Sequence, residues 1–357
     1  MKMEALMLRF PHLPEQIFLK MDNESLFKSR EIARSWDNMI SGRNHPWLRI
    51  VNIPSILKKR NTYHQSHSSY LDLSAETGQI QVFKTAFSEA EDKNIKNEFG
   101  LTPFHIACTN GRLQIVKLLV QTTDLEINTK IILNAQTKLG DTALHLACEK
   151  GHTDVFKILF ENAADLRIDL NMLSFYGYTA FHFACMKGNL NVFKPFMENA
   201  ATLSINLNTA SNIGLTGFHL ACIHGHTDLV KIFMENAAKL SIHLNTKDNK
   251  DWTAFYHACS NGHTYLVKIF MENAAKLSFD LNAKDKIGWT TFQIACREGH
   301  LGVVNIFMNY AVALNISINI KNNDGMTALH VACLWGYSDI VKVFLENTAT
   351  LTIDLNA

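Results

Sequence analysis

No apolar run in the 357 residues approaches the roughly 18 residues that a membrane-spanning helix needs. Charge of either sign is not in excess, since 34 Lys and Arg against 33 Asp and Glu leave a net charge of +1. That balance provides no overall field to draw the chain onto nucleic acid or an anionic membrane. Glu4 and Arg9 interrupt the apolar block that a secretory signal requires. We therefore expect a protein of the cytoplasm or nucleus with neither a nucleic-acid nor a membrane partner.

The sequence also lacks the common motifs of catalytic sites. A glycine-rich phosphate loop, G-x-S-x-G, H-E-x-x-H and C-x-x-C are all missing. Each motif brings together a nucleophile, a base, a phosphate cradle or metal ligands, and none of these groupings is present. The sequence therefore predicts a protein that is not an enzyme and that uses no cofactor or metal ion.

All seven cysteines occupy one position of an internal repeat. Gly140–Cys148 recurs at Gly177–Cys185 and then at further steps of 37 residues, and the related Gly100–Cys108 precedes it by 40 residues. Self-similarity with a period of roughly 20 to 50 residues predicts a stacked solenoid, in which each unit buries its apolar face against its neighbours. We expect reduced thiols at this shared position. The cysteines are Cys108, Cys148, Cys185, Cys222, Cys259, Cys296 and Cys333.

Each unit has the pattern of two helices. Thr142 precedes an apolar run and predicts a helix N-cap, and Gly151 is expected to end this first helix. A second apolar stretch continues through Leu166 with a helical period, which predicts a second helix longer than the first. A turn-rich connection then leads to the next unit.

The pattern G-x-T-A-[LF]-H-x-A-C, followed by G-H, an apolar helix and D-L-N, resembles the ankyrin repeat. The resemblance implies an all-α fold, an α-solenoid with β-hairpin loops, with seven clear repeats at 97–357 and a degenerate capping unit at 71–96. Each repeat exceeds the usual unit of about 33 residues by about one helical turn, so we expect a lengthened second helix. Pro195 is expected to kink or interrupt the second helix of repeat three, and Asp251 replaces a hairpin glycine in repeat five.

Aromatic residues gather at the positions that such repeats leave free for binding. The ankyrin resemblance implies that these positions are the hairpin residues before the threonine and the two residues after the cysteine. Aromatic and arginine side chains dominate binding hot spots, so the pattern predicts a groove for a protein or peptide in repeats three to seven. Alternatively, the rings stack on adjacent hairpins as edge packing. The predicted groove residues are Phe175, Tyr176, Tyr178, Trp252, Trp289, Arg297 and Trp335.

Three other periodic features have simple interpretations. Histidine–cysteine pairs, from His105 with Cys108 onward, are too few per repeat for a zinc site, so we expect the histidines to hydrogen-bond hairpin backbone and the thiols to pack as small apolar groups. Lysines followed four residues later by glutamate predict paired, solvated helix faces. Asparagines after Asp-Leu, such as Asn171, resemble the sites of asparaginyl hydroxylases in this family, or else each holds its own turn.

The amino-terminal segment lies outside the repeat register. Residues 1–60 hold eleven Lys and Arg against six Asp and Glu. Residues 1–54, with Leu-Pro before one apolar stretch and Ile-Ala-Arg-Ser-Trp in another, resemble an F-box, a small helical module, and 55–70 form a linker. The resemblance implies docking onto a Skp-type adaptor of a cullin ubiquitin ligase. The residues implied in that contact are Leu13, Pro14, Ile17, Leu26, Ile32 and Trp36.

Two functional hypotheses follow from this organisation. In the first, the chain is a monomeric adaptor, the substrate receptor of a Skp/cullin/F-box-type ubiquitin ligase, and its ankyrin groove captures the substrate. In the second, it is an ankyrin scaffold or inhibitor without a ligase connection, and the amino-terminal helices only cap the first repeat, because the end repeats of a solenoid need covering.

Overall fold

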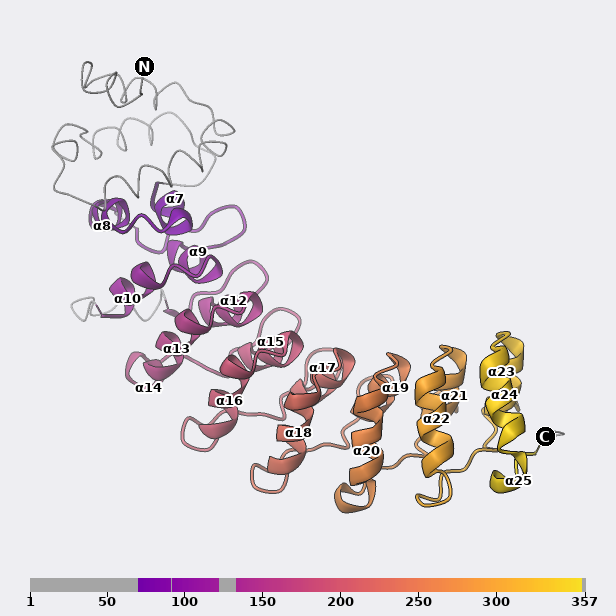
Figure 1. Cartoon of the computed structure of the whole chain (residues 1–357). Helices are drawn as coiled ribbons and strands as arrows, with labels where there is room; N and C mark the ends of the chain where they lie inside the picture. The colour runs from indigo at the N-terminus through magenta and orange to yellow at the C-terminus, as the bar shows by residue number, and fades with distance from the viewer. Residues whose placement is uncertain (1–69, 91, 122–132, 355–357) are drawn as a thin grey trace, which may run out of the picture. The chain divides into compact units, whose positions relative to one another are not determined.

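The computed structural model describes residues 70–90, 92–121 and 133–354 (Figure 1). The described residues form short helices joined by turns, and their only β pairing consists of isolated bridges such as Lys247 with Thr253. The expected all-α solenoid with hairpin loops is therefore confirmed. The chain divides into two compact parts, one comprising residues up to 138 together with 158–168, and the other comprising 139–157 with 169–357.

The N-terminal part is built from helix pairs. Helix α7 packs against both α8 and α9, and α9 packs against α10. Phe83 and Phe104 are buried within this part, which gives each pair an apolar centre. The helices are α7 (Tyr70–Thr77), α8 (Ile80–Glu89), α9 (Pro103–Thr109), α10 (Leu113–Gln121) and the one-turn α14 (Ala163–Leu166).

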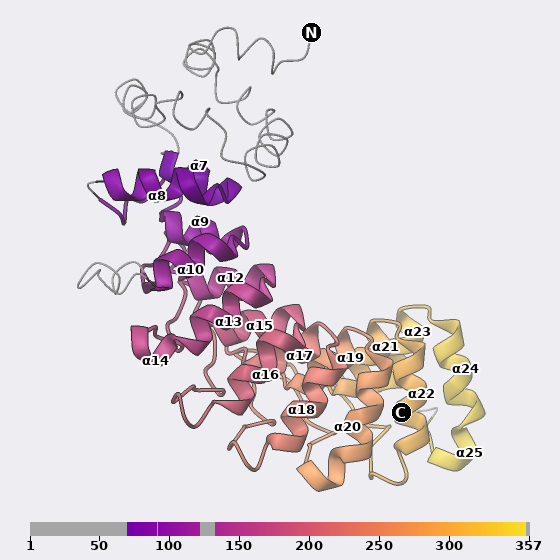
Figure 2. The ribbon, with the colours of Figure 1, turned by 60° about the vertical axis from the view of Figure 1, so that its left-hand side comes forward.

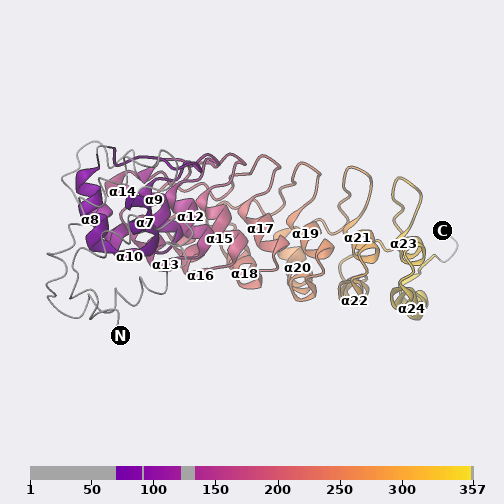
Figure 3. The ribbon, with the colours of Figure 1, turned by 90° about the horizontal axis from the view of Figure 1, so that it is seen from above.

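The C-terminal part stacks its helices in two rows (Figure 2). Each inner helix packs against the next inner helix along the chain, and from α15 onward each inner helix also packs against the outer helix that follows it. The inner helices are α12 (Ala143–Lys150), α15 (Ala180–Lys187), α17 (Gly217–Ile223), α19 (Ala254–Ser260), α21 (Thr291–Arg297) and α23 (Ala328–Leu334). The outer helices are α13 (Thr153–Glu161, whose last turn belongs to the N-terminal part), α16 (Leu190–Glu198), α18 (Thr227–Asn236), α20 (Thr264–Leu277), α22 (Leu301–Tyr310) and α24 (Ser338–Glu346), with the one-turn α25 (Thr348–Leu351). For α17 to α24, the hairpins lie on one side of the inner helices and the outer helices on the other (Figure 3).

Threonine caps start the inner helices, as expected. The Thr179 side chain accepts a hydrogen bond from the His182 backbone N–H, and His182 Nδ1 accepts one from the Thr179 backbone N–H at 3.0 Å. With Nδ1 as an acceptor, the proton lies on Nε2, which donates to the Leu215 carbonyl of the next hairpin at 3.1 Å. One histidine thus caps its own helix and anchors the following repeat.

A phenylalanine ladder fills the space between the rows. Phe181, Phe193, Phe218 and Phe233 are almost completely buried, and their rings lie next to one another. Such large apolar side chains contribute most of the stabilisation that each repeat gains from its neighbours.

The extra residues of each repeat do not simply lengthen the second helix. Helix α13 ends at Glu161 and a separate turn follows, so the expected continuation through Leu166 is wrong. Among the outer helices of the C-terminal part, only α20 runs on without a break, to Leu277. The added turn ends instead on one residue in the left-handed conformation, with φ between 46° and 56°. These residues recur every 37 positions: Arg167, Ser204, Ser241, Ser278, Asn315 and Thr352.

An asparagine from the preceding repeat holds each of these turns in the C-terminal part. Asn208 Nδ2 donates to the Ser241 carbonyl at 2.8 Å, and its Oδ1 accepts the His243 N–H at 2.9 Å. Asn171 makes the equivalent two bonds, to Ser204 and Asn206. Each asparagine therefore belongs to one repeat and holds the turn of the next. Because these hydrogen bonds connect neighbouring repeats, the 37-residue period has a structural role.

Replacing Asn208 with alanine is expected to lower the free energy of unfolding by about 1–2 kcal/mol, because two hydrogen bonds between repeats are lost together. Urea denaturation followed by circular dichroism measures the change. Asn191→Ala, an exposed position on α16, is the control and is expected to shift stability by less than about 0.5 kcal/mol. Equal effects of the two substitutions would contradict the role assigned to Asn208.

Two irregular positions have different outcomes. Helix α16 continues through Pro195 to Glu198, so the expected interruption does not occur. Asp251, which replaces a hairpin glycine, adopts the left-handed conformation with φ 63°, which a glycine adopts at lower cost.

Candidate functional site

The hairpins and the ends of the inner helices form one continuous surface of the C-terminal part. Arg297, directly after a repeat cysteine, lies over the Trp289 ring of its hairpin, 5.3 Å from the guanidinium carbon to the ring centroid. Neighbouring hairpin tips are joined by backbone hydrogen bonds, from the Asn212 N–H to the Tyr176 carbonyl at 3.0 Å and from the Asn249 N–H to the Ile213 carbonyl at 3.1 Å. We call this surface, formed by the hairpin residues before each threonine and the two residues after each cysteine, the hairpin face.

Apolar side chains at the hairpin tips are exposed in a row. Tyr176, Ile213 and Ile287 stand directly before the hairpin glycine of repeats three, four and six, and each is more than half exposed. Phe175 beside Tyr176 is 71% exposed. Buried residues pack the rest of each repeat, so this row is a candidate surface for a partner.

The predicted aromatic residues fall into two groups. Phe175, Tyr176 and Trp335 are mostly exposed and remain available to a partner. Trp289 is only 8% exposed, and Trp252 is half-buried. For these two tryptophans the edge-packing alternative describes the observed contacts.

Trp252 is held in a stack of side chains. Its ring stacks on Tyr256 with 4.6 Å between centroids, and the Lys250 ammonium lies 4.5 Å from the indole centroid. Tyr178 is likewise half-buried, with edge contacts to His182 and Phe183. These rings therefore brace the hairpins and present only part of their area to solvent.

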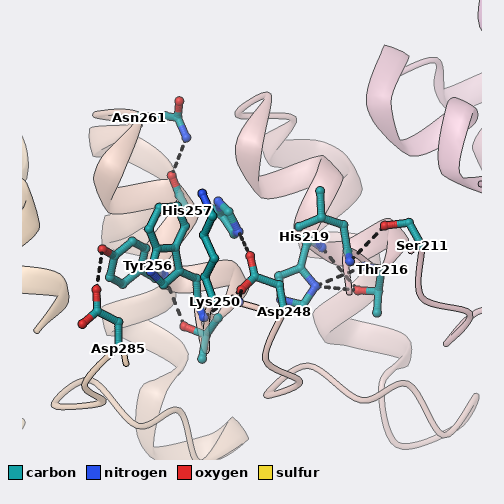
Figure 4. A network of polar contacts seen from close by, with 12 residues as sticks. Ser211, Thr216, His219, Asp248, Lys250, Tyr256, His257, Asn261 and Asp285 are labelled. Atoms are coloured by element: carbon teal, nitrogen blue, oxygen red, sulfur yellow. Dashed lines mark hydrogen bonds and ion pairs between the residues drawn. The ribbon is translucent and has the colours of Figure 1, made fainter. Parts of the chain in front are cut away.

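Repeat five departs from the histidine pattern and forms a polar network that includes Asp248, Tyr256 and His257 (Figure 4). Tyr256 stands at the histidine position, and its hydroxyl donates to Asp285 at 3.2 Å. His257, one residue later, donates from Nε2 to Asp248 at 3.0 Å. Burial lowers the pKa of His257, an effect that Asp248 partly offsets, so the neutral ring is the donor.

Both aspartates of this network also hold their own hairpins. Asp248 accepts the backbone N–H groups of Lys250 at 2.8 Å and Trp252 at 3.0 Å, and Asp285 accepts the equivalent bonds from its hairpin. Their oxygens are therefore engaged in structure. Burial, and next the Asp285 charge, raise the pKa of Tyr256.

One capping histidine differs from the others. His219 bonds to Thr216 through Nδ1, but its buried Nε2 makes no hydrogen bond of normal geometry, although the Trp252 and Thr246 carbonyls face it. The equivalent positions in repeats five and six hold Tyr256 and Gln293, so the histidine pattern is not uniform through repeat seven.

The thiols pack as the small apolar groups expected from the sequence. Cys108, Cys148, Cys185, Cys222, Cys259 and Cys296 are completely buried, and burial raises the thiol pKa of each. Cys333 of the last repeat is exposed instead. Across the described ranges no group of three or more His, Cys, Asp or Glu is placed to hold a metal ion.

The predicted groove residues are aromatic residues and one arginine, and they do not include the aliphatic tips Ile213 and Ile287. The signal that identifies them is their place directly before the hairpin glycine. The candidate adaptor-binding residues, Leu13, Pro14, Ile17, Leu26, Ile32 and Trp36, lie outside the described residues.

Comparison with protein families identifies one architecture. The family model described as "Ankyrin repeats (3 copies)" matches residues 71–172, 127–209, 181–285 and 271–356. The matched residues do not include 1–54, where the F-box resemblance lies. No curated protein matches the sequence. Within the described part of the chain, no helix is long and apolar enough to cross a membrane.

Proposed function

Because the chain belongs to the ankyrin-repeat family, whose repeats support protein–protein interaction, we propose that it is a monomeric, non-enzymatic adaptor that captures a protein or peptide on the hairpin face. The observation that carries this proposal is the row of exposed apolar tips at Tyr176, Ile213 and Ile287. The position before the hairpin glycine is apolar and solvent-exposed in all three of these repeats, and a recurring exposed apolar position is typical of a surface that a partner covers.

Replacing the three tips with serine tests this proposal. We expect Tyr176→Ser/Ile213→Ser/Ile287→Ser to reduce partner capture at least about tenfold, because truncating a side chain that anchors an interface costs about 2 kcal/mol or more. Affinity capture by the purified full chain, followed by quantitative mass spectrometry, measures the loss. Tyr265→Ser/Val312→Ser/Leu345→Ser is the matched control, since these exposed residues lie on or beside outer helices. Capture that resists the first triple change would contradict binding at the hairpin face.

The amino-terminal resemblance supports a more specific role. We propose that 1–54 form an F-box-like module, joined by the linker 55–70 to the capping unit 71–96 and the repeats 97–357. In this role the module docks onto a Skp-type adaptor through Leu13, Pro14, Ile17, Leu26, Ile32 and Trp36, and the hairpin face presents the substrate to a cullin ubiquitin ligase. The alternative is a scaffold or inhibitor whose amino-terminal helices only cap the repeats.

A pull-down with recombinant Skp-type adaptor separates these two roles. We expect the purified full chain to retain the adaptor and Leu13→Ala/Pro14→Ala to lose it, because both residues lie in the resembling motif. Leu6→Ala/Pro11→Ala changes the same residue types outside that motif and serves as the control. Absence of binding by the folded wild-type chain would leave the scaffold or inhibitor role.

A further inference from the structure

Positive charge is concentrated on one stretch of the hairpin face. In repeats three to six its positions carry four cations, Lys187, Lys250, Lys286 and Arg297, and two carboxylates, Asp251 and Glu298. Glu298 is already paired with Arg297 at 2.6 Å. Asp251 occupies the adjacent turn position of repeat five. The stretch therefore has an excess of cations beside the exposed apolar tips.

Two further carboxylates near this stretch are buried and do not face a ligand on the surface. Asp248 and Asp285 are less than one-tenth exposed, and each accepts two backbone N–H groups and one side-chain donor. Their oxygens are therefore occupied by hydrogen bonds that hold the hairpins. A ligand on the surface meets the lysines first, since Lys187, Lys250 and Lys286 are all exposed.

Two histidine rings lie next to each other beside this stretch. His224 is exposed, and its ring lies 5.9 Å from that of His226. Burial lowers the pKa of His224, and the neighbouring His226, Lys187 and His263 lower it further. The groups that act on His224 are therefore basic ones. His226 and His263 are fixed in place by donating to the carbonyls of Met186 and Ile223.

The outer helices have a different charge pattern. Their lysines pair with glutamates one turn later, as in Lys268 with Glu272 at 3.7 Å and Lys342 with Glu346 at 3.9 Å. The sequence interpretation of paired, solvated faces holds for these helices. On these two outer helices each of these lysines therefore has a carboxylate partner on the same helix.

We propose that the partner segment is an extended acidic peptide with apolar side chains at intervals. Its carboxylates would meet Lys187, Lys250 and Lys286, and its apolar side chains would cover Tyr176, Ile213 and Ile287. This inference rests on the proposed function and adds the chemistry of the partner. Charge complementarity of this kind contributes mainly to specificity and to the rate of association.

A nucleic acid fits the same surface less well. Nucleic-acid binding depends mainly on cations that neutralise phosphates, and this stretch offers four, one of them paired with Glu298. Bases stack on aromatic platforms, whereas two of the three tips are isoleucines, and Trp252 already stacks on Tyr256. The surface therefore favours a peptide.

Selection of a random displayed-peptide library against the purified full chain tests the inference. We expect the selected sequences to be rich in Asp, Glu and apolar residues. Their affinity is expected to fall at least about tenfold in Lys187→Glu/Lys250→Glu/Lys286→Glu, and to weaken as salt is raised. The matched control Lys194→Glu/Lys268→Glu/Lys342→Glu makes the same charge change on outer helices and is expected to leave affinity unchanged. Circular dichroism confirms the fold of each variant, and the glutamine version of the first triple is expected to give an intermediate loss.

The other outcomes are distinct. Selected peptides without acidic residues, or peptides that ignore the charge reversal but are lost with Ile213→Ser, would overturn the acidic partner and leave the proposed function standing. Displacement of the peptides by a single-stranded oligonucleotide, with tighter binding of that oligonucleotide, would overturn it in favour of nucleic acid. Peptides that ignore both the charge reversal and the tip substitutions would overturn the inference and the proposed function together.

Discussion

Phe233→Ala is expected to lower the free energy of unfolding by about 3–5 kcal/mol, which is the range for truncating a fully buried phenylalanine. Phe233 is completely buried, and its ring centroid lies 5.0 Å from Phe193, 5.3 Å from Phe218 and 5.9 Å from Phe181. These rings belong to repeats three and four, so the cavity would open between two repeats and weaken the contact on which each depends.

Urea denaturation of the full chain, monitored by circular dichroism, measures this loss. Phe175→Ala is the matched control, because Phe175 is 71% exposed and the same atoms are removed from a surface position. Its expected effect is within about 0.5 kcal/mol. If the two substitutions proved equally costly, the ring ladder would not be the main contact between repeats three and four.

Acidification is expected to destabilise the chain through its capping histidines. Burial lowers the pKa of His145 and of His182 to about 4, from the ordinary value of about 6.5 in the unfolded chain. Above pH 6.5 neither state takes up a proton, so stability does not change. Between about pH 6.5 and 4 only the unfolded chain is protonated, so the free energy of unfolding falls by about 1.4 kcal/mol per pH unit for each such histidine, and it levels off below that.

His182→Gln isolates one of these contributions. Gln293 performs the same task in repeat six, accepting from the Thr290 N–H at 2.9 Å and donating to the Ile320 and Met326 carbonyls. Glutamine does not titrate, so we expect the variant to lose about 2 kcal/mol less than the wild type between about pH 7 and pH 5. Urea midpoints at the two pH values measure this difference. An unchanged pH dependence would show that His182 is protonated equally easily in both states.

Most of the repeat architecture was predictable because it depends on local chemistry. The cysteine spacing set the register, threonine at each helix start supplied a cap, and Gly151 ended a helix through its left-handed conformation. Whether Pro195 would interrupt its helix was not predictable from local sequence. Helix α16 tolerates the missing N–H and continues to Glu198.

The candidate site was only partly predictable. The repeat pattern identified the positions of the hairpin face, but not how much surface each side chain keeps after packing. Trp252 and Trp289 occupy equivalent positions before a threonine, yet Tyr256 and Lys250 cover the first, while Arg297 lies over the second. Exposure at a hairpin depends on such neighbours.

The sequence by itself determined the repeat, its register and the start of each inner helix, because period, caps and glycines act within a few residues. Only the tertiary structure decided where the extra residues of each repeat go. Their turn is held by an asparagine from the preceding repeat, as Asn208 holds Ser241, and a bond between residues so far apart in the chain has no local sequence signal. It likewise decided that Trp335 is exposed and Trp289 buried, since burial depends on which neighbouring side chains the stack brings into contact.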